Sequence, residues 1–409
     1  MRILLINKFY RLSGGAERHL FDWESLLRSR GHDVKVFSMR HPENRPCEQE
    51  KHFVEGVEFG MAMPWRNRMA AGLHAIWNAE ARDRLDGLLR ETGRPDVAHL
   101  HSYMFHLTPS IFLPLRRLSV PVVQTCHDYA PVCVNQHLYD NRSGNICEAC
   151  LHVGRLAPLW RRCMKGSFLW SAAGCAAGLV DRYLVGTRRI VSLFFAPSEF
   201  MRRKLVEGGL PAERIVHMPH FVDAESIVPA DTPGEFILFF GRLVPQKGLF
   251  TFLRAAAMRP DIPCAVLGGG DLEKAAGEWL QDRGIANVRL LGRLDGEALW
   301  HAVRRARAVV VPSEWYEPFG LVVLEAMAAA RAVIASRIGG PAEIVSHGET
   351  GLLFAAGEAD ALSQAMSALW HDPDLAIAMG RAGRERALQR YRPDAYYSRV
   401  MAHFEALVR

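Results

Sequence analysis

The sequence lacks an apolar run long enough to span a bilayer, which takes about 20 residues in a helix. The nearest approach, residues 167–180, is closed by Lys165 on one side and Asp181 on the other. The opening Met-Arg-Ile-Leu-Leu-Ile-Asn-Lys is too short for the apolar core of a signal peptide and predicts a strand instead. We therefore expect a cytoplasmic protein that at most lies against the inner face of the cell membrane.

A strong charge imbalance is also missing. The 50 basic and 44 acidic residues give a net charge of +6, dispersed along 409 residues. This surplus is too small to indicate nucleic-acid binding, but it suits anionic lipid headgroups or phosphorylated ligands. Because 49% of the residues are hydrophobic, the chain can fill two cores, and its length predicts two domains of roughly 200 residues.

Four of the eight cysteines lie close together in the sequence, at Cys133, Cys147, Cys150 and Cys163. In a reducing compartment they are expected to be thiols unless they hold a metal. The Cys-x2-Cys core with one outlier on each side leaves three interpretations open: a structural zinc ion, free thiols or a redox pair. A zinc ion held by four sulfurs would have no open position for catalysis.

Strands and helices alternate along the first half, which predicts a doubly wound α/β domain. Strand 3–6 leads through a loop with Gly14 and Gly15 to a helix over 16–30 and a strand over 34–38. Further strands are expected over 57–61, 96–102, 120–126, 194–197 and 215–218, with helices over 66–90, 167–189 and 199–207. The basic amphipathic helix 66–90 is interpreted either as a membrane or acceptor contact or as an ordinary surface helix.

The strand over 120–126 delivers His127 and Asp128 to its carboxyl end, where ligands of doubly wound domains bind. The plainer interpretation is a histidine bonded by its own neighbour Asp128. We interpret His99 and His101 as ordinary residues at the end of the preceding strand.

The second half opens with strand 236–240, a glycine-flanked loop and a helix over 249–258. This layout is typical of a phosphate cradle, in which Arg242 supplies a planar fork and Lys247 a point charge. The loop differs from the Walker pattern, so an ATPase is not indicated. A solvated basic turn is the alternative. Later strands are expected over 264–268, 288–291, 308–311, 332–336 and 352–354.

The stretch from 312 to 325 reads Pro-Ser-Glu-Trp-Tyr-Glu-Pro-Phe-Gly-Leu-Val-Val-Leu-Glu and predicts a loop between a strand and a helix. We expect Pro318 in the first helical turn and Gly320 where a ligand approaches the backbone. On one helix, Glu317 and Glu325 would lie roughly 80° apart around the axis and about 12 Å apart along it. Glu325 is expected to be buried and to need a partner, either a bound sugar or a loop amide.

This stretch resembles the Glu, seven residues, Glu motif of retaining family 4 glycosyltransferases. The similarity extends to Gly241-Arg242, Lys247-Gly248, Gly339-Gly340 and Gly348-Glu349-Thr350-Gly351. It covers nearly the whole chain and is stronger in the second half. Ala330 and Ala332 stand where the family usually has Gly and Pro, which affects the end of the helix more than the chemistry.

The resemblance implies a GT-B architecture, with two doubly wound Rossmann-like domains facing an interdomain cleft. We expect an acceptor-side domain over 1–219 with a cysteine-bearing insert at about 129–166, a linker over 220–234, and a nucleotide-sugar domain over 235–390. Residues 391–409 are expected to form a terminal helix that packs back on the first domain.

The resemblance also implies roles for single residues. Arg242, Lys247 and the amides of Gly320 and Leu321 would hold the donor diphosphate, and the loop at Gly15 would face it. Glu317 would bind sugar hydroxyls, Glu325 the ribose, and His127 would support the reacting carbon.

The implied activity is retaining hexosyl transfer, without a metal ion in catalysis, from a UDP- or GDP-linked sugar to a glycan or lipid-linked glycan. Cell-surface polysaccharide biosynthesis is the expected setting. Two alternatives stay open: a nucleotide-sugar epimerase of similar build, and a non-catalytic protein that binds sugar nucleotides.

Overall fold

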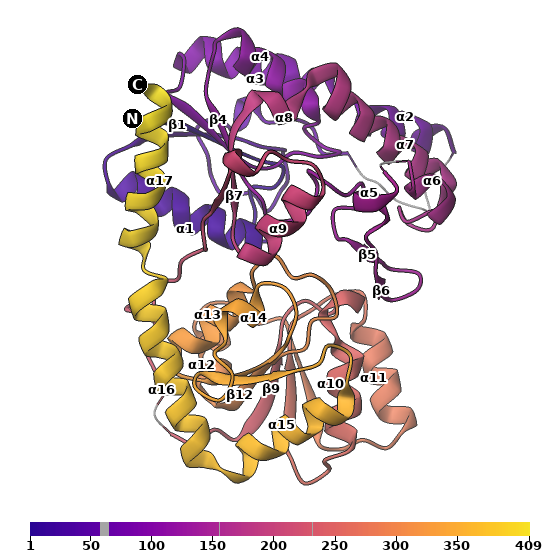
Figure 1. The fold of residues 1–409 in the computed structure, drawn as a ribbon, viewed down its shortest axis with the longest axis vertical. Helices are drawn as coiled ribbons and strands as arrows, with labels where there is room; N and C mark the ends of the chain where they lie inside the picture. Colours follow the sequence, from indigo (N-terminus) through magenta and orange to yellow (C-terminus); the bar gives the residue numbers. More distant parts are fainter. Residues whose placement is uncertain (58–64, 155, 231) are drawn as a thin grey trace. The chain divides into compact units, whose positions relative to one another are not determined.

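The computed structural model describes residues 1–57, 65–154, 156–230 and 232–409 (Figure 1). These residues form two compact units, which are described separately. Unit 1 comprises residues 1–142, 147–218 and 397–409, and unit 2 comprises residues 143–146 and 219–396. The strand predicted over 57–61 lies outside the described residues from position 58 onward.

Unit 1 is built on a parallel six-stranded sheet in the order β2-β1-β3-β4-β7-β8. The inner strands are largely buried on both faces, as expected for a parallel sheet covered by helices on both sides. The strands are β1 (Arg2–Asn7), β2 (Asp33–Phe37), β3 (Val97–Ser102), β4 (Val122–Thr125), β7 (Val191–Ala196) and β8 (Ile215–His217).

Two helices predicted in unit 1 are broken in the structure. The expected helix over 66–90 is two helices, α2 (Trp65–Ile76) and α3 (Ala79–Thr92), because Asn78 adopts an extended conformation and its side chain accepts a hydrogen bond from the Ala81 amide at 2.9 Å. The expected helix over 167–189 consists of α7 (Phe168–Leu179), the π-helical turn η3 (Val180–Val185) and α8 (Thr187–Ile190). Gly186, with φ of 73°, separates the last two.

Shorter elements and the chain end complete unit 1. The terminal helix α17 (Pro393–Val408) contributes Tyr397, whose hydroxyl lies 2.8 Å from His32 Nε2, and Arg399, which donates to the His217 carbonyl at 2.6 Å. The other elements of this unit are α1 (Gly15–Ser29), η1 (Glu50–His52), η2 (Pro109–Ile111), α4 (Phe112–Arg117), β5 (Tyr139–Asp140), α5 (Ala149–His152), α6 (Pro158–Arg161), α9 (Glu199–Glu207) and η4 (Ala212–Arg214).

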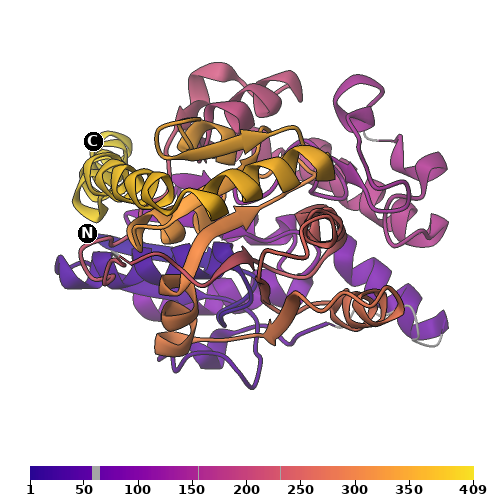
Figure 2. The same cartoon turned by 90° about the horizontal axis from the view of Figure 1, so that it is seen from below.

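Unit 2 has its own parallel sheet in the order β11-β10-β9-β12-β13-β14, and helices cover both of its faces (Figures 1 and 2). Two hydrophobic cores lie on the two sides of this sheet. Its strands are β9 (Phe236–Phe240), β10 (Cys264–Leu267), β11 (Val288–Gly292), β12 (Ala306–Val311), β13 (Ala332–Ser336) and β14 (Gly351–Phe354). The predicted class, two doubly wound α/β units, is therefore confirmed.

Apart from the short strand β6, the remaining elements of residues 143–396 are helices that follow the strands of the sheet. They are β6 (Asn145–Ile146), η5 (Pro245–Lys247), α10 (Leu249–Ala257), α11 (Glu273–Asp282), α12 (Gly296–Arg304), α13 (Leu321–Ala328), α14 (Pro341–Ile344), α15 (Ala359–His371) and α16 (Pro373–Arg390). Across the part of the chain that the structure describes, no helix combines the length and the hydropathy needed to cross a membrane.

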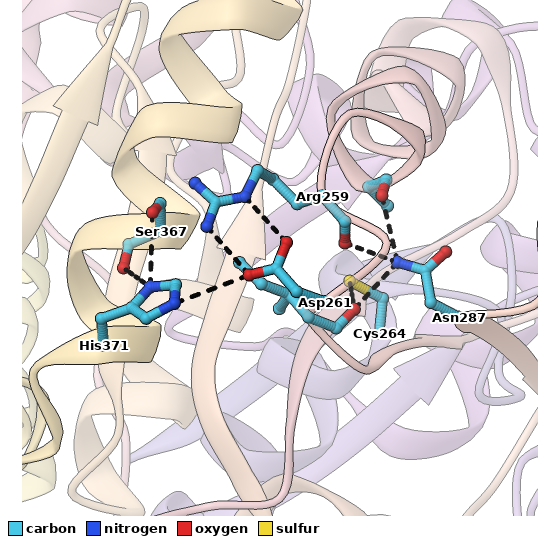
Figure 3. A network of polar contacts seen from close by, with 8 residues as sticks. Arg259, Asp261, Cys264, Asn287, Ser367 and His371 are labelled. Carbon is cyan, nitrogen blue, oxygen red and sulfur yellow. Dashed lines mark hydrogen bonds and ion pairs between the residues drawn. The ribbon is translucent and has the colours of Figure 1, made fainter.

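A polar network holds the amino-terminal edge of the unit 2 sheet together (Figure 3). Asn287 donates to the carbonyls of Ala256 and Ile262, at 3.0 and 2.9 Å. The Asp261 carboxylate pairs with Arg259 at 2.9 Å and with His371 at 3.5 Å. Because β10 begins at Cys264 and β11 directly follows Asn287, this network lies at the edge opposite the loops that leave the carboxyl ends of the strands, and we interpret it as structural.

Gly248 sets how closely the loop after β9 approaches the loop after β12. Its φ is 70°, and a Cβ at this position would lie 1.8 Å from the Pro312 carbonyl oxygen. A side chain would therefore meet both an unfavourable backbone conformation and a backbone clash. Gly284 has a similar φ of 63° but no atom within 4 Å of a Cβ, which makes it a matched control.

We predict that Gly284→Ala lowers the free energy of unfolding by about 1–2 kcal/mol, the cost of the left-handed conformation. Gly248→Ala should lose about 1–3 kcal/mol more, because the added methyl group overpacks the loop contact. Calorimetric or denaturant unfolding of the full chain measures both losses. Equal losses for the two variants would show that the approach of the loops tolerates a methyl group.

Candidate active site

An ion pair joins two predicted site residues that are 70 positions apart in the sequence. Lys247 Nζ lies 2.5 Å from Glu317 Oε1 and 2.7 Å from Oε2. Glu317 is buried, and its Oε2 also accepts from the Ser313 hydroxyl at 2.6 Å and the Trp315 indole N–H at 3.1 Å. Since β9 and β12 are neighbours in the sheet, the loops at their carboxyl ends meet and form this cluster.

Contacts beyond the ion pair hold the two loops in register. The Glu314 amide donates to the Gln246 carbonyl at 2.9 Å, and the Thr251 hydroxyl donates to Glu314 Oε1 at 2.5 Å. Together with the packing of Gly248 on Pro312, these bonds fix η5 against the loop that carries Glu317. The position of Lys247 is therefore set by backbone and side-chain bonds and not by the ion pair alone.

The pKa of Glu317 reflects two opposing effects. Burial by itself raises the pKa of a carboxyl group. The positive charge of Lys247 and the hydrogen bonds from Lys247, Ser313 and Trp315 outweigh burial, and the pKa of Glu317 is below its ordinary value. The carboxylate is therefore ionised at neutral pH, and the pair has no net charge.

The helix after this loop begins later than predicted. α13 starts at Leu321, and its N-cap is Gly320 in the left-handed conformation, with φ of 96°. The expectation that Pro318 occupies the first helical turn is therefore wrong. The left-handed backbone conformation of Gly320 is not helical, so the helix begins only after it, at Leu321. Glu317 lies in the loop, so the predicted spacing of two glutamates along one helix does not hold either.

Glu325 lies on α13 and is partly exposed. The prediction of a buried carboxylate at this position is wrong. Glu325 lies on a partly exposed side of the helix, although its sequence neighbours Leu324 and Ala326 are buried. Gly320 and Leu321 stand at the start of the helix, where backbone N–H groups point outward and favour anions. These two amides and Lys247 belong to the same pair of loops.

Arg242 is exposed on the loop that follows β9. Glycines hold this loop against the loop after β10, since a Cβ on Gly268 would lie 1.8 Å from the Gly241 carbonyl oxygen. The Leu243 amide also donates to the Gly269 carbonyl at 3.0 Å. The glycines thus serve loop packing, and the Arg242 side chain stays directed to the surface.

In unit 1, His127 belongs to a cluster of histidines. Its Nε2 lies 2.8 Å from His101 Nδ1, and the two rings stack with centroids 5.1 Å apart. His19 on α1 places its ring 5.6 Å from His127 and 6.1 Å from His101. Asp128 accepts a hydrogen bond from the Ala130 amide at 2.9 Å. His101, interpreted from the sequence as an ordinary strand-end residue, thus contacts the predicted site residue His127.

His99 extends the cluster into the core. The Trp23 indole N–H lies 3.0 Å from His99 Nδ1, and an indole only donates, so this nitrogen must accept. The ring proton of neutral His99 then sits on Nε2 and is donated to Thr125 Oγ1 at 2.8 Å. Burial lowers the pKa of His99 and of His127 to about 3, so both rings are neutral at pH 7.

Gly15 stands at the start of α1, directly after its N-cap Gly14, and is exposed. The loop that precedes it leaves the carboxyl end of β1, which lies beside β3 in the sheet. The strand ends that carry Asn7 and His101 therefore belong to the same edge as the Gly15 loop.

Ser313, Trp315, His19 and His101 are the side chains that sequence reasoning did not assign. Ser313 and Trp315 were quoted in the motif, but their approach to Glu317 depends on the turn of the loop. For His101 a signal exists, since a histidine lies near the carboxyl end of both β3 and β4, and neighbouring parallel strands bring their carboxyl ends together. This signal can be used only when the order of the strands in the sheet is known.

The cysteines of the insert are partly gathered. A hydrogen bond between the free thiols of Cys133 and Cys150, together with burial, raises the pKa of Cys133 well above its usual range. Burial, followed by the charges on Cys150 and Cys147, raises the pKa of Cys163 to about 12. Among the described residues, one set of three metal-binding side chains converges within 4.8 Å, and it is Glu148, His152 and Glu207 rather than these cysteines. The Lys204 ammonium already contacts both of those glutamates.

A cavity of about 410 Å³ lies beside α12 in unit 2. Its lining includes Arg289, His301 and Arg305 and contains none of the predicted site residues. The candidate site in this unit is thus defined by its loops and charges and not by that cavity.

Comparison with known proteins gives matches along most of the chain. A family model described as Glycosyltransferase Family 4 matches residues 13–226, and one described as Glycosyl transferases group 1 matches residues 224–386. The two matches together cover both units.

Individual relatives agree with these models. The chain is 35% identical to a D-inositol 3-phosphate glycosyltransferase of Pseudarthrobacter chlorophenolicus, over 92% of this chain and 86% of that protein. It is 28% identical to a glycogen synthase of Mycobacterium tuberculosis, over 94% of this chain and 90% of that protein. The structure of Anabaena HepE in complex with UDP and glucose matches with a TM-score of 0.71 at 18% identity, over 99% of this chain and all (100%) of that one, which shows a shared GT-B fold.

We predict that Glu317→Gln lowers the free energy of unfolding at pH 7 by about 1.5–3 kcal/mol, the value of hydrogen bonds to a charged group. Because the folded pKa of Glu317 lies below the unfolded value of about 4.3, its contribution is complete above that value and is lost as pH falls through the folded pKa. Denaturant unfolding at pH 7 and near pH 3 measures the difference in free energy of unfolding between the unchanged chain and Glu317→Gln. This difference should be smaller near pH 3 than at pH 7. Glu349→Gln, at an exposed glutamate, is the control. If the difference in free energy of unfolding for Glu317→Gln were as large near pH 3 as at pH 7, the ion-pair explanation would be contradicted.

Proposed function

The chain belongs to glycosyltransferase family 4, and from that premise we propose that it transfers a hexosyl unit from a nucleoside diphosphate sugar to a glycan or lipid-linked glycan. The observation that carries the proposal is the convergence of Lys247, Glu317 and the amino terminus of α13 at one edge of unit 2. The proposal includes retention at the anomeric carbon and catalysis without a metal ion. Assembly of cell-surface polysaccharide at the inner face of the membrane is the setting we propose.

Donor binding by unit 2 is supported by the chemistry of its loops. A lysine ammonium has three donors, and Glu317 accepts from it with both oxygens, so one donor is left for a phosphate oxygen. The exposed Arg242 adds a planar fork that suits a diphosphate. With the amides of Gly320 and Leu321, these cations would stabilise the charge that develops on the leaving diphosphate.

For Glu317 the contacts favour a positioning role. Its Oε2 already accepts from Lys247, Ser313 and Trp315, and its Oε1 accepts from Lys247. A carboxylate offers about four lone-pair positions, so little capacity is left for sugar hydroxyls. We propose that Glu317 fixes Lys247 for the phosphate, and that binding of sugar hydroxyls is the smaller part of its role.

His127 is proposed to support the reacting carbon as a neutral imidazole. Its low pKa excludes a role as a cation at neutral pH. The contact with His101 restricts the ring orientation and couples its tautomer to that of His101. Glu325 is proposed to bind the ribose, and its partial exposure leaves it accessible to a ligand.

We predict that one UDP- or GDP-linked sugar raises the melting temperature of the purified chain. Ligand at about 100 times its Kd adds about 2.7 kcal/mol of stability. Lys247→Ala should weaken this binding at least about tenfold, because the phosphate loses its cation. This corresponds to a loss of about 1.4 kcal/mol or more in binding free energy. Lys274→Ala, an exposed lysine on α11, should leave the shift unchanged.

Results of the binding assay and of turnover assays could each contradict the proposal. The absence of a shift with every donor would contradict donor binding, and release of free nucleotide without sugar transfer would favour the epimerase. A chelator that abolishes turnover would contradict metal independence, and inversion at the anomeric carbon, read by NMR of the product, would contradict retention. His127→Ala should keep the donor shift and lose turnover; unchanged turnover would remove His127 from the mechanism.

We also propose that Cys133, Cys147, Cys150 and Cys163 hold a structural zinc ion in the insert of unit 1. The contact between Cys133 and Cys150 supports part of this grouping. No three of the four sulfur atoms lie within 4.8 Å of one another among the described residues, so metal binding would have to draw them together. Four thiolates match the preferred ligand set of structural zinc, which would also deprotonate thiols whose pKa values are otherwise high.

We predict about one zinc ion per chain after dialysis, and a lower melting temperature after its removal by a chelator, because metal binding stabilises the folded insert. Cys150→Ser should lose the metal, whereas Cys264→Ser, on β10 of unit 2, should keep it. Metal analysis with thiol alkylation measures both. Zinc far below one per chain, with thiols that alkylate readily, would contradict the site.

A further inference from the structure

Unit 1 exposes a group of large apolar side chains on neighbouring segments, which we call the α2–α7 face. The most exposed are Leu184 (78%) and Tyr183 (69%) on η3 and Leu73 (67%) on α2, and Trp160 on α6 is 64% exposed. The face comprises Met69, Leu73, Leu156, Trp160, Phe168, Leu169, Leu179, Tyr183 and Leu184. These are nine of the sixteen large apolar side chains that are exposed among the described residues.

The segments of this face lie side by side. α2 packs against α7, where Gly72 faces Ala173, and α6 also packs against α7. η3 follows α7 without a break. Figure 1 shows α2, α6 and α7 gathered at one end of unit 1. Single exposed apolar residues are ordinary on protein surfaces, but a contiguous group of this kind marks an interaction site.

Positive charge surrounds the apolar side chains. Residues 156–190 contain six basic residues and one acidic residue, and α2 adds Arg66 without any acidic residue. The single acidic residue, Asp181, is buried and accepts a hydrogen bond from the Tyr103 hydroxyl at 2.7 Å. The basic residues exposed here are Arg66, Arg161, Arg162, Lys165, Arg182 and Arg189.

This combination fits one kind of partner. Tryptophan, phenylalanine and leucine beside arginine and lysine are the composition of surfaces that lie in the interface of an anionic bilayer. A second copy of the chain is a poor occupant, because two such faces would bring like charges together. We propose that the α2–α7 face rests on an anionic lipid surface, with its apolar side chains at the acyl boundary and its basic side chains at the headgroup phosphates.

The inference extends the proposed membrane setting of the transferase, but it rests on this surface and not on sugar transfer. It also corrects the sequence-based location of such a contact. The predicted helix over 66–90 contributes only its first part, α2, because α3 begins a separate helix at Ala79 with Glu80 in its first turn. The larger part of the face comes from α6, α7 and η3.

The test is cosedimentation of the full chain with vesicles of phosphatidylcholine alone and with about one third phosphatidylglycerol. We expect binding to the anionic vesicles only, and loss of binding at high salt, where headgroup charges are screened. Trp160→Ser combined with Leu184→Ser should weaken binding at least about tenfold, or about 1.4 kcal/mol. Arg161→Gln combined with Arg162→Gln should do the same and reduce the salt dependence.

Matched controls come from unit 2. Val228→Ser with Met258→Ser removes two exposed apolar side chains, and Arg381→Gln with Arg390→Gln removes two exposed charges on α16. Both pairs should bind vesicles as the unchanged chain does.

The donor-induced melting shift of each variant separates a failure to fold, or a failure of the proposed activity, from a failure of lipid binding. Three results would overturn the inference: no binding to anionic vesicles, equal binding by the face variants and the controls, or a change of oligomeric state in the face variants, which would assign the face to self-association.

Discussion

A buried carboxylate must be paired, and in unit 2 this requirement organises the edge of the sheet where the candidate site lies. Leaving the ionised Glu317 without partners would cost several kcal/mol, so the fold has to bring Lys247, Ser313 and Trp315 to it. The main-chain oxygen of Glu317 also accepts from the Gly340 amide at 2.8 Å. Three loops that are distant in the sequence are thereby held in one arrangement around a single residue.

The candidate residues of the two units differ in charge: those of unit 2 are ionised, and the buried histidines of unit 1 are neutral. In unit 2, Glu317 is kept ionised, because the charge of Lys247 and the hydrogen bonds to the carboxylate offset its desolvation. In unit 1, burial keeps His99 and His127 neutral, and their rings are oriented by hydrogen bonds and stacking. The first arrangement suits a diphosphate, whose charge grows during transfer, and the second suits an uncharged sugar. This division agrees with the roles proposed for the two units.

The insert of unit 1 joins two features that otherwise look unrelated. The cysteines and the exposed Trp160 lie on the same short stretch, and Arg161 Nη1 is 3.6 Å from Cys147 Sγ. Among its described residues, the helices of this stretch are the short α5 and α6, which have little stability of their own. A metal ion there would supply the order that local structure lacks, and would hold α6 in place beside α7 at the proposed lipid surface.

By itself, the sequence determined the elements and the motifs. Apolar strands and glycine-flanked loops recur at a regular spacing, so the strands of unit 2, the loop with Arg242 and Lys247, and the family resemblance could all be predicted. Local chemistry also decided where the predicted helices break, at the N-cap Asn78 and at the left-handed Gly186. The long apolar patterns around these two residues led to the prediction of continuous helices. These features depend on residues that are near one another in the chain.

Only the tertiary structure decided which side chains meet. The pairing of Lys247 with Glu317, the stacking of His101 on His127 and the side of α13 that exposes Glu325 follow from strand order and loop packing. The same holds for the α2–α7 face, because α2 and α7 are about 100 residues apart in the sequence and become neighbours only through tertiary packing. The physical reason is that burial and the pairing of charges depend on distances in space, which local periodicity does not encode.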